Sequence, residues 1–298
     1  MSKEAGSHFV DVNGVRLHYL QWSDGAPTLV IMHANSHCGG LWGPVATELA
    51  DRYRVIAMDL RGHGLSDKPD RGYDWGTLRD DLVATLEALD LRGVVLVGHS
   101  RGGGASILAA CKAPERIAAA VFYEPTMAGG DAPKGRASLD EAPETPRGQQ
   151  ALRRRPLFGS RQEIYDSYRP RSPFKEWTDE ALWAYLEHGT KVRDDGQVEL
   201  LCPPWVEAKL YDELAFPDEW IGISNPQLPV LACFGEQSGR VRPGQDPGAA
   251  LRRIFPRTEV QVLAGASHFG PMEQPENVAA IIRRFVEERV SGPDYGGQ

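Results

Sequence analysis

A serine between two glycines is the first feature of the sequence that indicates catalysis. The apolar run Val94-Val95-Leu96-Val97 continues into Gly98-His99-Ser100-Arg101-Gly102 and then into a helical pattern. A strand that enters Gly-x-Ser-x-Gly and leaves as a helix is typical of a strained turn that holds a nucleophilic serine above a sheet. Side chains at positions 98 and 102 would collide at such a turn. We therefore predict that Ser100 is a nucleophile, with the N-terminus of the next helix favouring developing negative charge.

A nucleophilic serine needs a base, and His268 has the most suitable position among the eight histidines. A serine hydroxyl is a weak nucleophile until a neighbouring group takes its proton. His268 follows a predicted strand over residues 259–263 and precedes the last predicted helix, which places it at the same edge of the sheet as Ser100. We predict His268 as the general base, His99 as a packing residue and His37 as part of the pocket wall.

The elements that must position these residues alternate between strands and helices. An alternation of this kind predicts a mostly parallel sheet with helices on both faces. Asn13-Gly14 predicts a hairpin near the start of the chain. The predicted strands cover residues 28–32, 53–60, 94–97, 117–123, 229–234 and 259–263, and the predicted helices cover 41–50, 74–91, 102–113, 247–255 and 275–290.

The alternation stops after Pro125 and resumes near residue 227. Residues 128–150 are rich in Gly, Pro, Ala and charge, and helical patterns with many aromatic residues follow them. The simplest interpretation is one α/β domain that carries an insertion. We predict a core domain of residues 1–125 and 227–298, with a helical cap, or lid, over residues 126–226.

Four segments of the chain resemble motifs of the α/β-hydrolase fold superfamily. They are His33-Ala34-Asn35, where the family usually shows His-Gly, the turn from Asp59 to Ser66, the elbow from Gly98 to Gly102, and the loop Gly265-Ala266-Ser267-His268-Phe269. The resemblance implies an α/β-hydrolase sheet, mostly parallel, with helices on both faces. It also implies a capped serine hydrolase, similar to esterases and lactonases.

The acid that orients the base is the position where this sequence departs from the usual family pattern. The family places an Asp in a Gly-x-x-Asp loop, but the stretch Gly235-Glu236-Gln237-Ser238 has Ser238 at that position. Another branch, which some serine lactonases and haloalkane dehalogenases resemble, places the acid at the end of the preceding core strand. Here that residue is Glu124. We predict Glu124 as the acid that holds the imidazolium, with Glu236 and Asp246 as alternatives.

The resemblance also indicates which backbone groups form an oxyanion hole. Acyl transfer needs donors aimed at the oxygen of the tetrahedral intermediate. The family positions correspond to the N–H groups of Asn35 and Arg101. Arg101 is unusual there, since a medium-sized apolar residue is more common. We expect its side chain either to pair with a buried carboxylate such as Glu124 or to lie at the surface.

Aromatic residues near the predicted oxyanion loop and in the predicted cap are candidates for a hydrophobic substrate pocket. An aromatic stripe at helical spacing can equally form the core of the cap itself. The candidates for the pocket are Trp42, His37, Trp177, Trp183 and Trp205.

These residues predict hydrolysis of a small-molecule carboxylic ester or lactone through an acyl-enzyme on Ser100. No metal and no organic cofactor is implied. The serine argues against the chemistry of haloalkane dehalogenases and epoxide hydrolases, which need a carboxylate nucleophile. A C–C bond hydrolase, a thioesterase, a perhydrolase or an acyltransferase remains an alternative on the same triad, because a fold does not determine a reaction. A slow-turnover small-molecule receptor is an alternative of another class.

Composition excludes several further classes. The chain of 298 residues has a net charge of −8, and an acidic chain without a basic block is a poor nucleic-acid binder. No stretch approaches about 18 apolar residues, so we expect no membrane helix. Four scattered cysteines without a C-x-x-C motif and the lack of an apolar leader predict reduced thiols in a cytoplasmic protein. We expect a monomer or a homodimer.

Overall fold

An eight-stranded sheet carries the elements that lead to the predicted site. The structure is a computed structural model, and it describes residues 4–127, 145–212 and 227–290. The strand order is β1-β2-β4-β3-β5-β6-β10-β11. The strands are β1 (Gly6–Val12), β2 (Val15–Trp22), β3 (Thr28–Met32), β4 (Arg54–Met58), β5 (Val94–His99), β6 (Ile117–Tyr123), β10 (Val230–Gly235) and β11 (Thr258–Leu263).

The direction of the strands confirms the predicted sheet. Strands β1 and β2 pair antiparallel, and β2 is antiparallel to β4. All other neighbours in this sheet pair parallel. The predicted hairpin is present, because Val12 pairs with Val15 around Asn13 and Gly14, whose φ angles are 49° and 73°. These positive values explain the Asn-Gly pair, since few other residues adopt them without strain.

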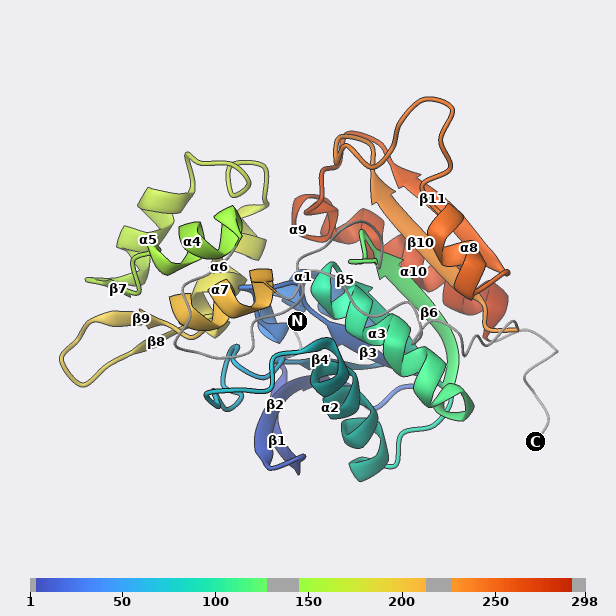
Figure 1. Cartoon of the computed structure of the whole chain (residues 1–298), viewed down its shortest axis with the longest axis horizontal. Helices are drawn as coiled ribbons and strands as arrows, with labels where there is room; N and C mark the ends of the chain where they lie inside the picture. Colours follow the sequence, from blue (N-terminus) through green and yellow to red (C-terminus); the bar gives the residue numbers. More distant parts are fainter. Residues whose placement is uncertain (1–3, 128–144, 213–226, 291–298) are drawn as a thin grey trace.

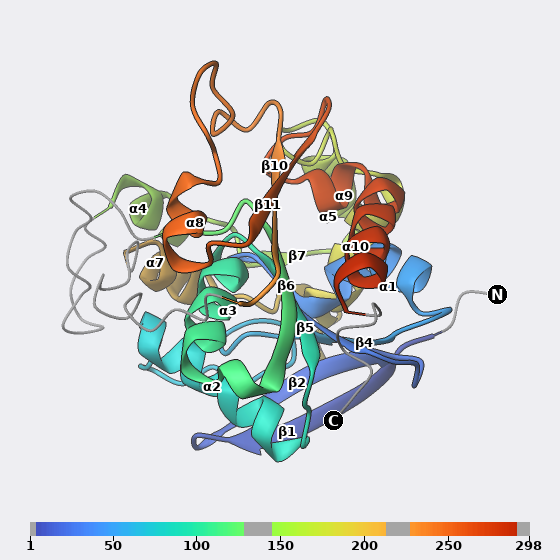
Figure 2. The ribbon, with the colours of Figure 1, turned by 90° about the vertical axis from the view of Figure 1, so that its right-hand side faces the viewer.

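Helices cover both faces of the sheet, as predicted (Figures 1 and 2). Helices α2 (Trp75–Ala88), α3 (Arg101–Lys112) and α8 (Ala249–Ile254) pack on one face, while α1 (Gly43–Leu49) and α10 (Pro275–Arg289) pack on the other. Strand β5 serves both faces, since Val94 and Leu96 join the first core cluster and Val95 and Val97 the second. This is the pattern of a central strand that is buried on both sides.

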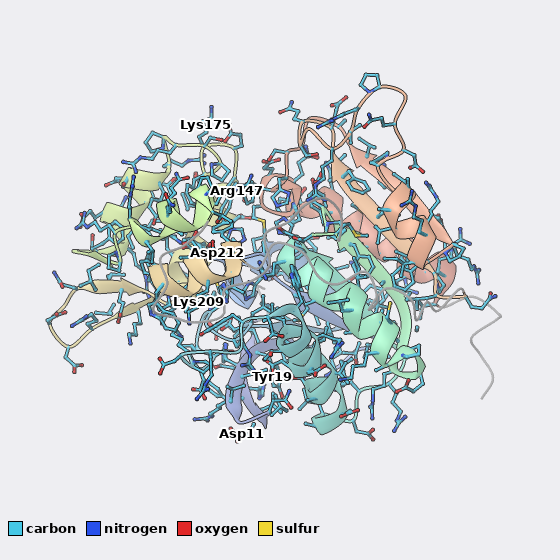
Figure 3. The ribbon with its side chains drawn as sticks, in the orientation of Figure 1. Asp11, Tyr19, Arg147, Lys175, Lys209 and Asp212 are labelled. Atoms are coloured by element: carbon cyan, nitrogen blue, oxygen red, sulfur yellow. The ribbon has the colours of Figure 1, made fainter. Side chains whose placement is uncertain are left out.

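The chain between β6 and β10 forms a group of elements beside the main sheet (Figure 1). Its helices are α4 (Pro146–Leu152), α5 (Arg161–Tyr168), α6 (Asp179–His188) and α7 (Pro204–Asp212). Arg147 on α4 and Asp212 on α7 are labelled in Figure 3, where the two helices pack together. Thr145 joins them, because its N–H and hydroxyl donate to Asp212 at 3.1 and 2.8 Å. Residues 128–144 and 213–226 of the predicted cap lie outside the described residues.

A three-stranded antiparallel sheet in this insertion is a feature that the sequence analysis missed. It consists of β7 (Leu157–Phe158), β9 (Val198–Leu200) and β8 (Thr190–Val192), in that order. The sequence signal was present in residues 190–200, where Thr-Lys-Val and Val-Glu-Leu flank Arg-Asp-Asp-Gly-Gln. Asp-Gly between short alternating segments is typical of a hairpin. Gly196 adopts a φ of 81° at this turn.

Short helices complete the described chain. They are η1 (Gly39–Trp42), η2 (Pro114–Arg116) and α9 (Gly270–Glu273). Within the described ranges, no helix combines the length and the apolar character needed to cross a bilayer. The four cysteines are buried and form no disulfide.

The turn after β4 links the sheet to the loop after β3. The Asp59 carboxylate accepts hydrogen bonds from the N–H of Gly39 at 2.7 Å and of Leu65 at 2.9 Å. Arg61 in the same turn donates two hydrogen bonds to Asp81 on α2, at 2.6 and 2.7 Å. Both of these side chains are only 5% exposed. The turn is therefore attached to α2 by an ion pair in which both the guanidinium and the carboxylate are removed from water.

We predict that Asp81→Leu lowers the free energy of unfolding by about 3–5 kcal/mol, because it leaves the Arg61 guanidinium buried without its carboxylate. Urea denaturation followed by circular dichroism measures this change. The double variant Arg61→Met/Asp81→Leu is expected to recover most of the loss, since it removes both charges. A double variant as unstable as the single one would contradict the prediction.

Candidate active site

Ser100 occupies the strained turn that the sequence predicted. It directly follows β5, and α3 begins at the next residue. Its φ of 51° and ψ of −114° are unusual for a residue with a side chain. A Cβ at position 98 would lie 2.6 Å from the Cα of Gly103, and one at position 102 would lie 2.2 Å from the carbonyl oxygen of Met32. Backbone atoms cannot move out of the way, so glycine is required at both positions.

Glu124 lies beside this turn because of the strand register. His99 pairs with Tyr123 at the ends of β5 and β6, so Ser100 and Glu124 are the next residues on adjacent parallel strands. The Ser100 N–H donates to the Tyr123 carbonyl oxygen at 3.1 Å. Glu124 also has a positive φ, 46°, and is completely buried. Its Oε1 accepts a hydrogen bond from the N–H of Gly235 at 3.0 Å, at the end of β10.

His268 reaches Glu124 from the loop after β11. Its Nδ1 lies 3.6 Å from Oε2 of Glu124. The loop is held in place by the Tyr123 hydroxyl, which donates to the Ser267 carbonyl oxygen at 2.8 Å, and by Nε2 of His99, which donates to the His268 carbonyl oxygen at 2.8 Å. His99 therefore supports the backbone of His268, a role more specific than the packing that the sequence predicted. The structure brings the segments of all three predicted triad residues to one edge of the sheet.

The two alternative acids make other contacts. Glu236 accepts a hydrogen bond from the N–H of Gly265 at 2.8 Å. Asp246 pairs with Arg252 and accepts from the N–H of Gly248 at 3.0 Å. In the described parts of the chain, the carboxylate that forms an ion pair with His268 is that of Glu124.

Two arginines behave differently from what the sequence suggested. The cation beside Glu124 is Arg240, whose Nε lies 3.0 Å from Oε2. Arg101 instead lies over the ring of Trp75, at 4.4 Å from its centroid, and donates to the carbonyl oxygen of Leu210. Glu124, the example given for a buried carboxylate partner of Arg101, pairs with Arg240 and His268 instead. The alternative of a surface side chain was wrong, because Arg101 is 4% exposed. The side chain is buried against α2 and α7. No local pattern marks Arg240, which belongs to an irregular loop.

The loop that carries Asn35 is attached to the elbow. The N–H of Gly102 donates to the carbonyl oxygen of His33 at 3.1 Å. His33 and His63 hold the loop from the other side, because their Nε2 atoms accept from the N–H groups of Leu60 at 3.0 Å and Ser36 at 3.1 Å. These bonds bring the backbone near Asn35 next to the start of α3, where Arg101 lies.

Three of the predicted pocket residues gather beside His268. The His37 ring lies 5.5 Å from that of Trp177 and 5.8 Å from that of Phe269, measured between centroids. Trp42 lies edge-on to His99 at 6.3 Å. His37, Trp42 and Trp177 are all buried. They form an aromatic wall next to His268.

Trp183 and Trp205 are not brought to this wall. Trp183 stacks on Tyr165 with a centroid distance of 5.1 Å, where α5 and α6 pack. Trp205 lies edge-on to Tyr73 at 5.9 Å, and Nζ of Lys209, labelled in Figure 3, is 5.0 Å from its ring centroid. The contact of Trp183 lies within the insertion, which is the alternative that the sequence analysis left open. Trp205 instead packs the insertion against Tyr73, outside residues 126–226.

The described residues contain no group of three or more His, Cys, Asp or Glu side chains that could hold a metal ion. A sequence model described as the alpha/beta hydrolase family matches residues 29–281. The chain belongs to this family.

The proteins similar to this alpha/beta hydrolase include named hydrolases and a named chloroperoxidase. A 2-(acetamidomethylene)succinate hydrolase from Mesorhizobium japonicum is 35% identical over 124 residues, which are 40% of this chain and 44% of that protein. A crystal structure of E-2-(acetamidomethylene)succinate hydrolase has a TM-score of 0.75 and 26% identity, and the match covers 95% of this chain and 99% of the other. The non-heme chloroperoxidase CPO-A1 from Kitasatospora aureofaciens is 28% identical over 268 residues, which are 86% of this chain and 90% of that protein.

The insertion contributes a buried ion pair close to the aromatic wall. Arg154 donates to the Glu207 carboxylate at 2.8 Å and to the Tyr185 hydroxyl at 2.6 Å. The Tyr185 ring lies 6.2 Å from that of His37. The side chain of Asn35 donates to the Glu207 carbonyl oxygen at 3.4 Å. Helix α7 is thus connected to the predicted oxyanion loop.

Four buried histidines make this edge of the sheet sensitive to acid. Burial lowers the pKa of His33, and it lowers the pKa of His37, His63 and His99 well below the usual value of 6.5. The unfolded chain exposes these rings and protonates them near pH 6.5. The folded protein keeps them neutral, so it binds fewer protons than the unfolded chain below that pH. Folding stability must therefore decrease as the pH decreases.

We predict that the free energy of unfolding is about 4 kcal/mol lower at pH 5.5 than at pH 7.5, since each of three strongly shifted histidines costs up to about 1.4 kcal/mol per pH unit. Urea titrations at several pH values measure the difference. His37→Phe keeps an aromatic ring and removes one titrating group, so its pH dependence should be shallower by about one proton. Equal stability at both pH values would contradict the prediction.

Proposed function

We propose that this alpha/beta hydrolase is a serine hydrolase that cleaves carboxylic esters or lactones through an acyl-enzyme on Ser100. The observation that supports it best is the pair formed by His268 and the fully buried Glu124, 3.6 Å apart, at the end of the strand next to Ser100. A buried carboxylate that faces Nδ1 of a histidine fixes the tautomer whose Nε2 can accept a proton. A serine on a strained turn beside this pair is suited to be the proton donor.

In the proposed mechanism, Oγ of Ser100 attacks the carbonyl carbon and His268 takes the hydroxyl proton. Glu124 stabilises the imidazolium that forms. The N–H groups of Asn35 and Arg101 donate to the oxyanion of the tetrahedral intermediate. Collapse of this intermediate expels the alcohol, which receives the proton from His268. A water molecule, deprotonated by His268, then hydrolyses the acyl-enzyme.

Residues 126–226 serve as a cap over this site in the proposed function. The proposed base lies against the buried rings of His37, Trp42 and Trp177, and such apolar surroundings favour an organic acyl or alcohol group over a highly charged one. Trp183 and Trp205 have less support as pocket residues, because they pack on Tyr165 and Tyr73. The serine nucleophile distinguishes this chemistry from that of dehalogenases and epoxide hydrolases in the same superfamily.

Perhydrolysis is a second candidate, favoured by the similarity to a protein named non-heme chloroperoxidase over 86% of this chain. The same acyl-enzyme would be attacked by hydrogen peroxide in place of water and would release a peracid. The two reactions share Ser100, His268 and Glu124. They differ in the second nucleophile, which is water in one and hydrogen peroxide in the other. Incubation with acetate and hydrogen peroxide, followed by an assay for halogenation by the peracid, separates the two reactions.

We predict sustained release of p-nitrophenol from short esters, acetate to octanoate, over many turnovers. Ser100→Ala should abolish this release, because it removes the nucleophile and preserves the fold. Absorbance at saturating substrate measures it, and the rates rank acyl length. A single burst without turnover would favour a receptor, and no release from folded protein would favour another bond, with lactones and C–C substrates tested next.

We predict that Glu124→Gln lowers kcat by about 10²–10⁴-fold, because the neutral amide cannot stabilise the imidazolium and favours the wrong tautomer. Glu236→Gln is the matched control, since Glu236 follows the adjacent strand and bonds Gly265. It should keep activity within a few fold of the parent protein. Loss of activity in the control alone would assign the acid to Glu236.

A further inference from the structure

Oε2 of Glu124 is approached by nitrogen atoms of two side chains that come from different loops. Nε of Arg240 lies 3.0 Å from this oxygen and Nδ1 of His268 lies 3.6 Å from it. Among the described side chains, none donates a well-aligned hydrogen bond to Oε2. Because both atoms approach the same oxygen, Nε of Arg240 and Nδ1 of His268 are separated by at most the sum of these two distances. A charge on Arg240 therefore acts on His268 at short range.

Arg240 also holds the backbone next to Glu124. Its Nη1 donates to the carbonyl oxygen of Pro125 at 2.7 Å. The following residue, Thr126, donates its N–H to the carbonyl oxygen of Ser100 at 2.8 Å. The guanidinium thus contacts both the side chain of Glu124 and the short segment that connects this carboxylate to the elbow.

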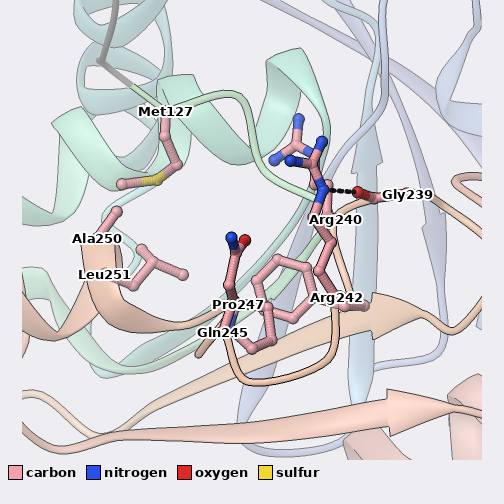
Figure 4. Close-up of a pocket in the computed structure, with 9 residues that line it drawn as sticks. Met127, Gly239, Arg240, Arg242, Gln245, Pro247, Ala250 and Leu251 are labelled. Carbon is pink, nitrogen blue, oxygen red and sulfur yellow. Dashed lines mark hydrogen bonds between the residues drawn. The ribbon is translucent and has the colours of Figure 1, made fainter.

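The side chain reaches this position from the rim of a cavity of about 310 Å³ in the loop region after β10. Met127 and Leu251 face Arg240 and Arg242 across the cavity (Figure 4). The Arg240 side chain is 40% exposed, while Glu124 is completely buried. Arg240 therefore lies partly in solvent at the rim, while its guanidinium contacts a carboxylate that water does not reach.

We propose that Arg240 is a positioning residue that holds the Glu124 carboxylate and extends to lower pH the range in which His268 is neutral and can act as a base. This inference rests on the proposed function. A guanidinium is always protonated in a protein. Its positive charge opposes protonation of the neighbouring imidazole, and it competes with that imidazole for one carboxylate oxygen. Without it, the full charge of Glu124 would act on His268 alone and favour the imidazolium.

Among the described groups that face His268, Arg240 is the permanent cation. The others are histidines, a tyrosine and a carboxylate. His99 lies 5.0 Å away between ring centroids, and His37 lies beyond it on the aromatic wall. Burial lowers the pKa of both rings well below the usual value, so neither adds a positive charge near neutral pH. Burial raises the pKa of the Tyr123 phenol above the range of interest. Glu273 is an anion, which bonds the N–H of Ser267 at 2.7 Å and is not altered by a change at Arg240.

The test compares three variants of the full chain. Arg240→Met removes the charge with a side chain of similar length, and Arg240→Lys keeps the charge. Arg242→Met is the matched control, because Arg242 lies on the same rim and donates to the carbonyl oxygen of Gly239 at 3.0 Å (Figure 4). The measurement is the pH dependence of kcat/KM with p-nitrophenyl acetate, fitted for the midpoint of the acid limb.

We expect the acid limb of Arg240→Met to move to higher pH by about one unit, the lower end of the shift that a charge within a few ångströms produces at a partly exposed position. Arg240→Lys should stay closer to the parent protein, and Arg242→Met should not differ from it. An unmoved limb in Arg240→Met would overturn the inference. So would equal shifts in the Met and Lys variants, or the same shift in the control, because either would indicate a structural effect of the loop.

A second measurement does not depend on turnover. The C2–H resonance of His268 is titrated by proton NMR in Ser100→Ala with and without Arg240→Met, and it is assigned by its loss in His268→Gln. The midpoint should rise by a similar amount when Arg240 is replaced. If no ester or lactone is hydrolysed, the proposed function fails while this titration still decides the inference. An unchanged midpoint would overturn the inference even in an active enzyme.

Discussion

The buried carboxylate of Glu124 is the group on which the organisation of the site depends. An ionised carboxylate that is removed from water is costly unless hydrogen bonds and opposite charges compensate for it. The compensation comes from the N–H of Gly235, the guanidinium of Arg240 and the imidazole of His268. Each lies beyond β6, at the end of β10 or in a loop that follows β10 or β11. One charge thus joins strand ends that are far apart in the sequence.

The backbone is strained both at Glu124 and at the neighbouring Ser100. Ser100 and Glu124 end adjacent strands and both adopt a positive φ, 51° and 46°, at a cost on the order of 1–3 kcal/mol each. The elbow and the segment after Glu124 hold each other, because Ser100 donates to Tyr123 and accepts from Thr126. Each turn is held by hydrogen bonds to the other. The parallel pairing of β5 and β6 therefore positions the proposed nucleophile, Ser100, and the proposed acid, Glu124, as one unit.

The parts of the site that could be predicted are those with a local signal. Ser100 lies in a strand, turn and helix pattern, and Glu124 follows a buried strand, so parallel register alone places them side by side. Arg240 lies in a loop without a periodic pattern, and its contact with Glu124 joins residues 116 positions apart in sequence. Arg101 was misjudged for a related reason, since its direction depends on how α3 meets Trp75 and α7. The hairpin over 190–200 had an Asp-Gly signal that was overlooked among helical patterns.

In the proposed function, the contacts of α7 connect the insertion with the catalytic site. In the proposed mechanism, the backbone of Asn35 contributes to the oxyanion hole, and the side chain of the same residue bonds the backbone of Glu207. The carboxylate of Glu207 in turn pairs with Arg154, which donates to Tyr185 beside the aromatic wall. The insertion thus holds the loop that contributes to the oxyanion hole in the proposed mechanism. Changes in α7 that alter substrate preference are therefore expected to alter the chemical step as well, because one set of contacts serves both.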